Sequence, residues 1–213
     1  MIELVVKVII SYLLGSIIGS LVVARFLGGG DIRNEGSGNA GGTNALRTRG
    51  KLFALLVMLI DVGKGVLAVA LVAAIDLPLI PEAGFRSEWT AVACGAAAVV
   101  GHVWPIFYGF RGGKGVATYV GVLGALAWPV LVMALLVWTV VLMLTGYVGL
   151  ASVVAPIVVA VYLLLTGLGP LFVFGLAMAL FITWTHRSNI RRLRDGTEHQ
   201  FEKAMLLHRL LGL

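Results

Sequence analysis

Three short polar stretches hold most of the side chains that could act on a charged substrate, and they are residues 28–51, 109–115 and 186–201. Their arginines and lysines supply charge that binds phosphate, and their glycines let successive backbone amides turn towards an anion. The rest of the chain is almost entirely apolar. A membrane protein whose polar residues gather in this way is predicted to handle a phosphorylated compound at one surface.

The first stretch, Gly28 to Lys51, has the composition of a phosphate cradle. It contains eight glycines, which allow backbone conformations that other residues rarely adopt. Hydrogen-bonding groups and charge are added by Ser37, Asn39, Thr43, Asn44, Arg47 and Arg49. A flexible linker is the alternative, but a linker does not need two arginines and four hydroxyl or amide side chains in so short a span. Arg33 is interpreted instead as an exposed charge on the cytoplasmic side.

The second stretch places a lysine among glycines, directly before the apolar run that begins at Val116. Free amides at a helix N-terminus, together with an ammonium group, bind anions. The candidate residues are Gly112, Gly113, Lys114 and Gly115. The stretch is not a Walker A loop, because Tyr108 stands where the first glycine would be and no Ser or Thr follows Lys114 to hold magnesium. Turn glycines beside a lysine that fixes membrane orientation remain the alternative.

The third stretch begins where the last apolar run ends. His186 and Asn189 are three residues apart, so they lie on one face of a helix and could together bind a hydroxyl or phosphate group. A structural histidine is an equally good interpretation of His186. The four arginines of this stretch are expected to anchor lipid headgroups.

The overall composition indicates what must position these stretches. Hydrophobic residues make up 60% of the chain and its mean hydropathy is +1.02, whereas charged residues make up 12%, about half the usual share in soluble domains. The chain is therefore predicted to be an integral membrane protein. Cys94 is the single cysteine of the sequence, which excludes a disulfide framework and a cysteine-based metal site.

Six apolar runs are candidates for membrane crossings, and they are residues 2–27, 52–75, 89–107, 116–144, 148–166 and 168–185. The fourth would form a helix about 43 Å long at ~1.5 Å per residue, against a hydrocarbon core of ~30 Å. Trp128 and Pro129 supply an interfacial aromatic ring and a helix breaker near its middle, so we divide the run there. The sequence thus predicts an all-α fold, a multi-pass transmembrane bundle of about seven helices, as a single domain over residues 1–213.

The distribution of positive charge predicts the orientation of this bundle. Residues 28–51, 108–115 and 186–213 hold four, two and six of the 16 lysines and arginines, whereas residues 76–88 hold Arg86 against three acidic residues. Basic stretches remain in the cytoplasm, so the N-terminus is expected outside and the C-terminus in the cytoplasm. Seven crossings place all three basic stretches on one face, and six would not.

Charged residues inside the apolar runs call for a separate interpretation. Asp61 and Lys64 stand three residues apart in the second run, where an unpaired charge would be costly, so we expect a structural ion pair rather than direct catalysis. His102 is expected to be a satisfied structural histidine. Gly15 and Gly19 form a small-residue face that is expected to pack against another helix.

Together the three stretches resemble one family closely, the bacterial acyl-phosphate:glycerol-3-phosphate acyltransferases. The similarity rests on GSGNAGGTNALRTRG (36–50), GHVWPIFYGFRGGKGVAT (101–118) and HRSNIRRLRDGTEH (186–199). The resemblance implies transfer of a fatty acyl group from acyl phosphate to the 1-hydroxyl of sn-glycerol 3-phosphate, which gives lysophosphatidic acid and phosphate in phospholipid synthesis. It also implies a multi-pass enzyme of the bacterial cytoplasmic (inner) membrane with its active site on the cytoplasmic face.

The resemblance also implies which residues do the work. The family's substrate-binding and catalytic positions are occupied here by Ser37, Arg47, Lys114, His186 and Asn189, and Thr43 and Ser152 are implied near the acyl-donor phosphate. Gly42 and Arg111 stand where other members commonly have Ala and Lys. The expected partners are the two substrates and membrane lipid. No cofactor, metal, nucleic acid or obligate protein partner is expected.

The chemistry of an acyl phosphate agrees with these residue types. It is a mixed anhydride with a good leaving group, so the enzyme mainly has to align two anions and stabilise developing charge. The leaving phosphate is expected to accept the hydroxyl proton, with His186 as the alternative base, and Ser37 is less favoured as a covalent nucleophile. A transporter of phosphorylated anions is disfavoured because no internal repeat is found, and a two-metal phosphotransferase because no carboxylate cluster is found.

Overall fold

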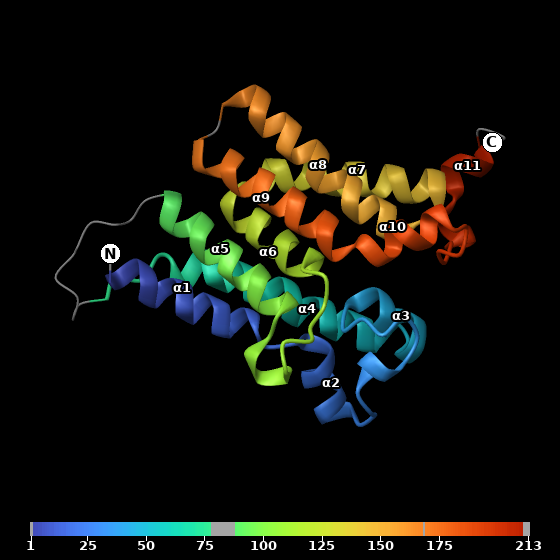
Figure 1. Ribbon diagram of the computed structural model, residues 1–213, viewed down its shortest axis with the longest axis horizontal. Helices are drawn as coiled ribbons and strands as arrows, with labels where there is room; N and C mark the ends of the chain where they lie inside the picture. Colours follow the sequence, from blue (N-terminus) through green and yellow to red (C-terminus); the bar gives the residue numbers. More distant parts are fainter. Residues whose placement is uncertain (1, 78–87, 168, 211–213) are drawn as a thin grey trace. The chain divides into compact units, whose positions relative to one another are not determined.

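The computed structural model describes residues 2–77, 88–167 and 169–210, and the regular structure within these ranges is entirely helical. The chain divides into two compact units, Met1–Leu126 and Ala127–Leu213. We describe each unit by itself, with the helix labels of Figure 1.

The first unit holds two of the three polar stretches. Its elements are α1 (Ile2–Gly15), α2 (Gly19–Leu27), η1 (Ile32–Asn34), α3 (Gly42–Arg49), α4 (Lys51–Leu67) with its π-helical continuation η2 (Ala68–Val72), α5 (Glu88–Val103), η3 (Ile106–Tyr108) and α6 (Val116–Leu126). Helix α1 packs against α5, α4 packs against α6, and α2 packs against α4. The connection before α5 was predicted to lie outside, and residues 78–87 of it, including Arg86, fall outside the described residues.

The second unit holds the third polar stretch. Its elements are α7 (Trp128–Thr145), α8 (Val148–Thr166), α9 (Gly169–Thr185), α10 (Arg187–Arg194), η4 (Glu202–Ala204) and α11 (Leu206–Leu210). Helix α8 packs against both α7 and α9, and the short α10 contacts α8 and α9. The unit is therefore three long helices followed by a short polar helix.

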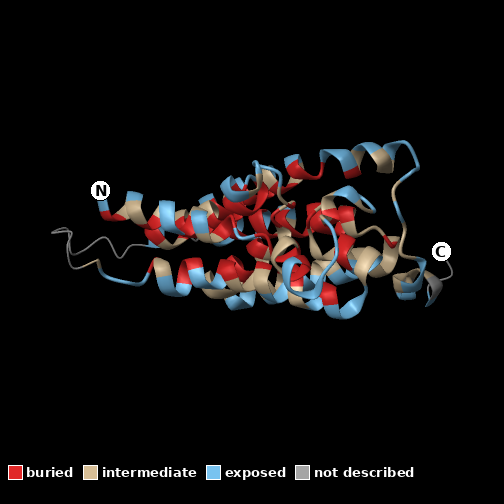
Figure 2. Cartoon of the chain, turned by 90° about the horizontal axis from the view of Figure 1, so that it is seen from below, coloured by how far each residue is buried: buried red, intermediate tan, exposed pale blue. Residues whose placement is uncertain are grey.

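The length and composition of the helices confirm the prediction of a multi-pass membrane protein. Four helical segments in the described residues are long and apolar enough to cross a membrane, and there are six if each of two bent helix pairs counts as one span. Helix α6, with 11 residues, is shorter than a crossing, so the predicted seventh crossing is not among these segments. Figure 2 shows buried and exposed residues alternating along the helices. Many of the exposed residues are large and apolar, as expected for helices surrounded by lipid.

The predicted division at Pro129 is confirmed. Helix α6 ends at Leu126, and α7 begins at Trp128 with Pro129 in its first turn, where the missing proline amide costs no helical hydrogen bond. The residue between the two helices, Ala127, has φ −158° and ψ 80°, which no α-helix contains. The long fourth run is therefore two helices.

The first apolar run, which was expected to make one membrane crossing, is not one continuous helix. The chain leaves the helical conformation at Ile18, which is extended, and α1 and α2 meet at 46°. The backbone groups released by this break are satisfied by two charged side chains of α4: Lys64 Nζ donates to Ile17 O at 2.6 Å, and Asp61 Oδ1 accepts from Gly19 N at 3.1 Å. The break persists in an apolar environment because its polar groups have these partners.

The predicted ion pair between Asp61 and Lys64 is confirmed. The Lys64 ammonium lies 2.9 Å from the Asp61 carboxylate, and both side chains are almost fully buried. His102 Nδ1 of α5 lies 2.8 Å from Lys64 Nζ, so the histidine is buried and bonded, as expected. The three side chains join α4, α5 and the break between α1 and α2 into one polar cluster.

Gly15 also behaves as predicted. A Cβ atom at this position would collide with the backbone of Ala98 on α5, so glycine is what allows α1 and α5 to approach closely. The small-residue face of α1 therefore packs against another helix, as the sequence indicated.

Candidate active site

The first polar stretch is built around the side chain of Asn44. Its Nδ2 donates to the carbonyl oxygens of Ile32, Glu35 and Asn39 at 3.2, 3.0 and 3.0 Å, and its Oδ1 accepts from the backbone amide of Ser37 at 2.9 Å. The side chain is buried. Asn44 was predicted to bind substrate, and the structure corrects this, because its hydrogen-bonding capacity is used to shape the loop.

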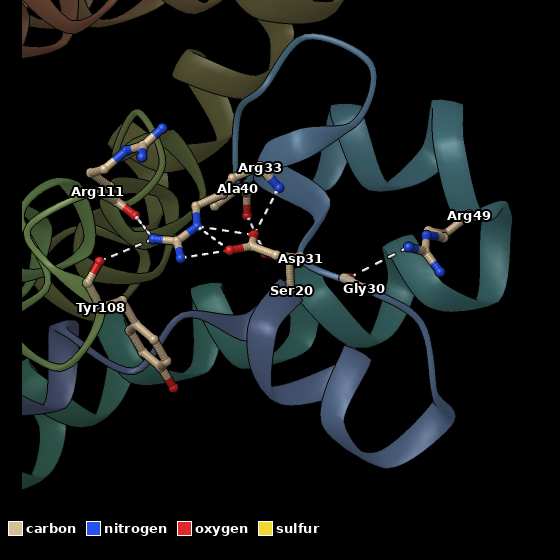
Figure 3. A network of polar contacts seen from close by, with 8 residues as sticks. All are labelled: Ser20, Gly30, Asp31, Arg33, Ala40, Arg49, Tyr108 and Arg111. Atoms are coloured by element: carbon tan, nitrogen blue, oxygen red, sulfur yellow. Dashed lines mark hydrogen bonds and ion pairs between the residues drawn. The ribbon is translucent and has the colours of Figure 1, made fainter.

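This loop is not a flexible linker. Ile32, Ala40 and Ala45 are completely buried, so the loop has apolar anchors of its own. The carbonyl of Ala40 accepts a hydrogen bond from Ser20 Oγ at 2.8 Å, which ties the loop to the start of α2 (Figure 3). The linker alternative is therefore wrong.

The loop's candidate substrate ligands fall into an exposed and a half-buried group. Ser37 and Arg47 are exposed, whereas Asn39 and Thr43 are half-buried. Thr43 and Arg47 are four residues apart on α3, so they share a helical face. Arg49 does not join them, because its guanidinium pairs with Glu35, with Nε 3.0 Å from Oε2. The expected contribution of Arg49 to an anion site is thus corrected.

The second polar stretch is packed tightly against the end of α5. The amides of Gly112 and Gly113 donate to the carbonyls of Val103 and His102, each at 3.1 Å, so they satisfy the open end of α5 rather than an anion. A Cβ at Gly112 would collide with the His102 carbonyl, and one at Gly113 with the imidazole. Glycine is required here for close packing. Gly115, at φ +90°, then turns the chain into α6, and Lys114 is held half-buried between these glycines.

One arginine joins the first stretch to the second. Arg33 Nη1 donates to the carbonyls of Tyr108 at 3.0 Å and Arg111 at 2.7 Å, while Nε and Nη2 bind the carboxylate of Asp31 (Figure 3). Arg33 was interpreted as an exposed positive charge, but its side chain is only 18% exposed, so that interpretation is wrong. Its acidic neighbour two positions earlier, Asp31, was the signal that could have indicated a bonded guanidinium.

Hydrogen bonding keeps the Asp31–Arg33 pair ionised. The side-chain bonds from Arg33 hold the pKa of Asp31 below its usual value, and the same bonds raise the pKa of Arg33. Because the folded pKa of Asp31 is depressed, the pair contributes stability at neutral pH that is lost only when acid protonates the carboxylate.

The third stretch, in the second unit, positions His186 at the N-terminus of α10. His186 Nδ1 lies 2.8 Å from the carbonyl oxygen of Ile182, which can only accept a hydrogen bond. Nδ1 therefore carries the proton, and in the neutral ring Nε2 is the acceptor nitrogen. The buried imidazole is thus held in the tautomer that can accept a hydrogen bond or proton from a hydroxyl group.

Asn189 is oriented by an acidic residue that the sequence analysis did not select. Asn189 Nδ2 donates to Glu198 Oε1 at 2.6 Å, and Arg192 Nε donates to Glu198 Oε2 at 2.6 Å. The Glu198 side chain is only 8% exposed. Glu198 could have been selected from the sequence, because it is a carboxylate that follows four arginines and a glycine turn. The turn residue, Gly196, does adopt φ +67°.

Ser152 lies on the face of α8 that approaches Asn189. Its hydroxyl accepts from Trp138 Nε1 of α7 at 3.2 Å, and it is buried. Gly149, three residues earlier on the same face, is where an added Cβ would meet Asn189 Nδ2 at 2.8 Å. The structure therefore gathers Ser152, His186 and Asn189 within the second unit, and Ser37, Thr43, Arg47 and Lys114 within the first.

Comparison with known proteins identifies the family. The family model described as "Glycerol-3-phosphate acyltransferase" matches residues 5–196. Relatives with the name glycerol-3-phosphate acyltransferase include one from Synechococcus sp. (strain CC9902), 43% identical over 89% of this chain and 90% of its own, and one from Jannaschia sp. (strain CCS1), 40% identical over 92% of each chain.

Solved structures agree with this assignment. The glycerol 3-phosphate form of PlsY (YgiH), an integral membrane glycerol 3-phosphate acyltransferase, has a TM-score of 0.80 and 36% identity, covering 96% of this chain and 98% of its own. Its lysophosphatidic acid form gives a TM-score of 0.79 at 35% identity. An enzyme of this kind works in phospholipid synthesis. The chain belongs to the glycerol-3-phosphate acyltransferase family.

Proposed function

We propose that this acyltransferase takes its acyl group from acyl phosphate and transfers it to the 1-hydroxyl of sn-glycerol 3-phosphate, which releases lysophosphatidic acid and inorganic phosphate. The choice of acyl phosphate as the donor rests on a feature of the sequence. None of the four histidines is followed by Asp five residues later, so the His-x-x-x-x-Asp pair of acyl-CoA-dependent enzymes is missing. The acceptor and product are supported by the similarity to PlsY, whose structures are described as glycerol 3-phosphate and lysophosphatidic acid forms.

The residues of both units are assigned to this one reaction. Lys114 and Arg47 bind phosphate groups of the two anionic substrates, and Ser37 and Thr43 add hydroxyl donors. His186 Nε2 accepts a hydrogen bond from the attacking hydroxyl, and Asn189, held by Glu198, fixes the acceptor beside it. Asn44 and the glycines at 112, 113 and 115 shape the loops and are not assigned to substrate.

The reaction needs no covalent enzyme intermediate. The 1-hydroxyl oxygen attacks the acyl carbonyl carbon, and the carbon–oxygen bond to phosphate breaks. The departing phosphate takes the hydroxyl proton, so that its good leaving-group character and its basicity serve the same step. His186 is the alternative proton acceptor, because its tautomer leaves Nε2 as the acceptor nitrogen.

We place the reaction at the cytoplasmic face of the bacterial cytoplasmic membrane, with the N-terminus outside. The support is the gathering of lysine and arginine in the three polar stretches. Both substrates are anions, which such a basic surface attracts.

The test is a donor comparison with purified protein in lipid vesicles. With acyl phosphate and glycerol 3-phosphate, we expect one inorganic phosphate released for each lysophosphatidic acid formed. Acyl-CoA at the same concentration should give no product. Efficient use of acyl-CoA, or phosphate release without lysophosphatidic acid, would overturn the assignment of the donor.

A further inference from the structure

The segment between Tyr108 and Arg111 contains an unfavourable backbone conformation. Phe110 has φ +58°, and in the described part of the chain no other residue except glycine has a positive φ. Side chains with a Cβ disfavour this left-handed region, and for a bulky residue such as Phe it is a true outlier. Phe110 is 56% exposed, so packing of its side chain does not explain the conformation. Local backbone bonds contribute, since the amides of Tyr108 and Phe110 donate to Pro105 O at 3.1 and 2.9 Å, and a side chain from the first stretch adds to them.

Arg33 holds the two carbonyl groups on either side of Phe110. A single nitrogen, Nη1, donates to Tyr108 O at 3.0 Å and to Arg111 O at 2.7 Å. Tyr108 and Arg111 follow Arg33 by 75 and 78 residues in the sequence, and in both the acceptor is a backbone carbonyl rather than a side chain. The guanidinium therefore acts as a clamp on the strained turn (Figure 3).

Asp31 fixes the orientation of the clamp. Its Oδ2 accepts from Arg33 Nε at 2.9 Å and from Nη2 at 2.6 Å, and its Oδ1 accepts from the Arg33 backbone amide at 2.9 Å. The carboxylate also neutralises the charge of the guanidinium. With its nitrogens occupied by Asp31 and two carbonyls, Arg33 is not a phosphate ligand, and its role is to hold the turn.

The turn leads directly to Lys114. From Gly112 onward the second stretch is tied to α5 by backbone hydrogen bonds, and before Gly112 it is tied to the first stretch by Arg33. The first stretch carries Ser37 in its loop and Arg47 on α3, and Asn44 of α3 accepts a hydrogen bond from the Ser37 amide. Arg33 thus links the segment before Lys114 to the stretch that carries Ser37 and Arg47.

We propose that the Asp31–Arg33 pair is a positioning device, which sets the distance between Lys114 of the second stretch and the substrate-binding residues of the first by holding the turn at Phe110. Arg33 does not touch substrate in this proposal. The inference rests on the proposed function, since it takes Lys114, Ser37 and Arg47 as the groups that must be aligned.

Substitution of Arg33 tests the proposal. Arg33→Gln should lower kcat/KM for glycerol 3-phosphate by between about tenfold and 100-fold, the cost of misplacing a binding group by roughly 1 Å. Arg33→Lys should lose less, because one ammonium keeps the charge but cannot reproduce the planar fork. The melting temperature should stay close to that of the wild type in both variants, which separates mispositioning from unfolding.

The matched control is Arg49→Gln, which removes another arginine–carboxylate pair of the same stretch. Arg49 binds Glu35 and does not reach the second stretch. This variant should change kcat/KM by less than about fivefold, the usual worth of a partly exposed ion pair. An equal loss in Arg49→Gln and Arg33→Gln would mean that any damage to the first stretch suffices, and the proposal would fail.

A double-mutant cycle makes the test specific to the strained turn. Asparagine adopts the left-handed conformation more readily than phenylalanine, so Phe110→Asn should make the turn less dependent on the clamp. Phe110→Asn alone should keep near wild-type kcat/KM, and in its background the loss caused by Arg33→Gln should shrink at least about threefold. If Arg33→Gln does not fold, the same cycle is run with Arg33→Lys.

Variants of Arg33 test the positioning role, and a variant of Lys114 tests the proposed function. Equal losses from the Arg33 substitution in both backgrounds, or wild-type kcat/KM in Arg33→Gln, would overturn the positioning role. Full activity of Lys114→Ala would instead overturn the assignment of Lys114 to substrate.

Discussion

The two units position their candidate catalytic residues in different ways. In the second unit, His186 is the N-cap residue of α10 and Asn189 lies in its first turn, so one short helix places both. In the first unit, Ser37 and Lys114 lie in loops whose shape depends on side-chain hydrogen bonds to backbone groups. Spacing in the sequence therefore specifies the helical site, whereas the loop site depends on contacts between distant residues.

The same contrast holds in the apolar part of each unit. Helices α7, α8 and α9 contain no Asp, Glu, Lys or Arg. The first unit buries two ion pairs, Asp61–Lys64 and Glu3–Lys7. Each lysine also donates a hydrogen bond to a backbone carbonyl: Lys64 to Ile17 O, and Lys7 to Ala73 O. Ile17 lies just past the end of α1, and Ala73 directly follows the π-helical segment η2. Buried charge is thus placed where the helical hydrogen bonding of the first unit is interrupted.

The largest effect is expected from removal of one of these charges. Lys64→Met should destabilise the first unit by about 3–5 kcal/mol, because it leaves Asp61 buried without its partner and Ile17 O without its donor. The measurement is thermal unfolding in detergent. Lys51→Met, an exposed lysine of the same helix, should change stability by less than about 0.5 kcal/mol. Similar stability of both variants would contradict the role of the pair at the break.

The next largest effect is expected on turnover. Lys114→Ala and Arg47→Ala should each lower turnover about 10²- to 10³-fold, since each removes a charge from the stabilisation of anionic groups. Folding should survive, as judged by gel filtration and melting temperature. Arg25→Ala removes an exposed arginine of α2 and serves as the control, with activity near that of the wild type. Near-normal activity in well-folded Lys114→Ala would show that the second stretch does not bind substrate.

A smaller effect is expected in the second unit. Glu198→Gln keeps the shape of the side chain but weakens its charge-assisted bonds to Asn189 and Arg192, so kcat/KM should fall about tenfold. Asn189→Ala should lose more than this. Asp195→Asn, an exposed acidic residue in the same turn, should be neutral. A loss in Glu198→Gln that equals that of Asn189→Ala would mean that Glu198 acts directly on substrate.

The sequence predicted features that depend on local spacing or on a single residue type. The division at Pro129 and the Asp61–Lys64 pair follow from a helix breaker and from helical periodicity. The class of membrane protein follows from composition. These predictions needed no knowledge of which helices are neighbours.

The features that the sequence did not predict depend on distant contacts. Ile17 and Ile18 carry no local signal for a helix break, because its cause is a charged pair more than 40 residues away on α4. Arg33 resembles an exposed charge until its two carbonyl partners, 75 and 78 residues further on, are known. Asn44 has the composition of a ligand, and only the folded loop shows that its amide is occupied.

We propose that the loops of the first unit and α10 of the second serve one reaction, which requires both to be exposed on the same side of the membrane. Single cysteines at Ser37, Ser188 and Trp128, each in a Cys94→Ala background, test this with an impermeant thiol reagent added to intact cells. All three positions are exposed and Cys94 is buried. We expect Trp128→Cys to react from outside, and Ser37→Cys and Ser188→Cys to react only after the membrane is opened. Labelling of Ser188→Cys from outside, with Ser37→Cys protected, would place the two regions on opposite faces and contradict the account.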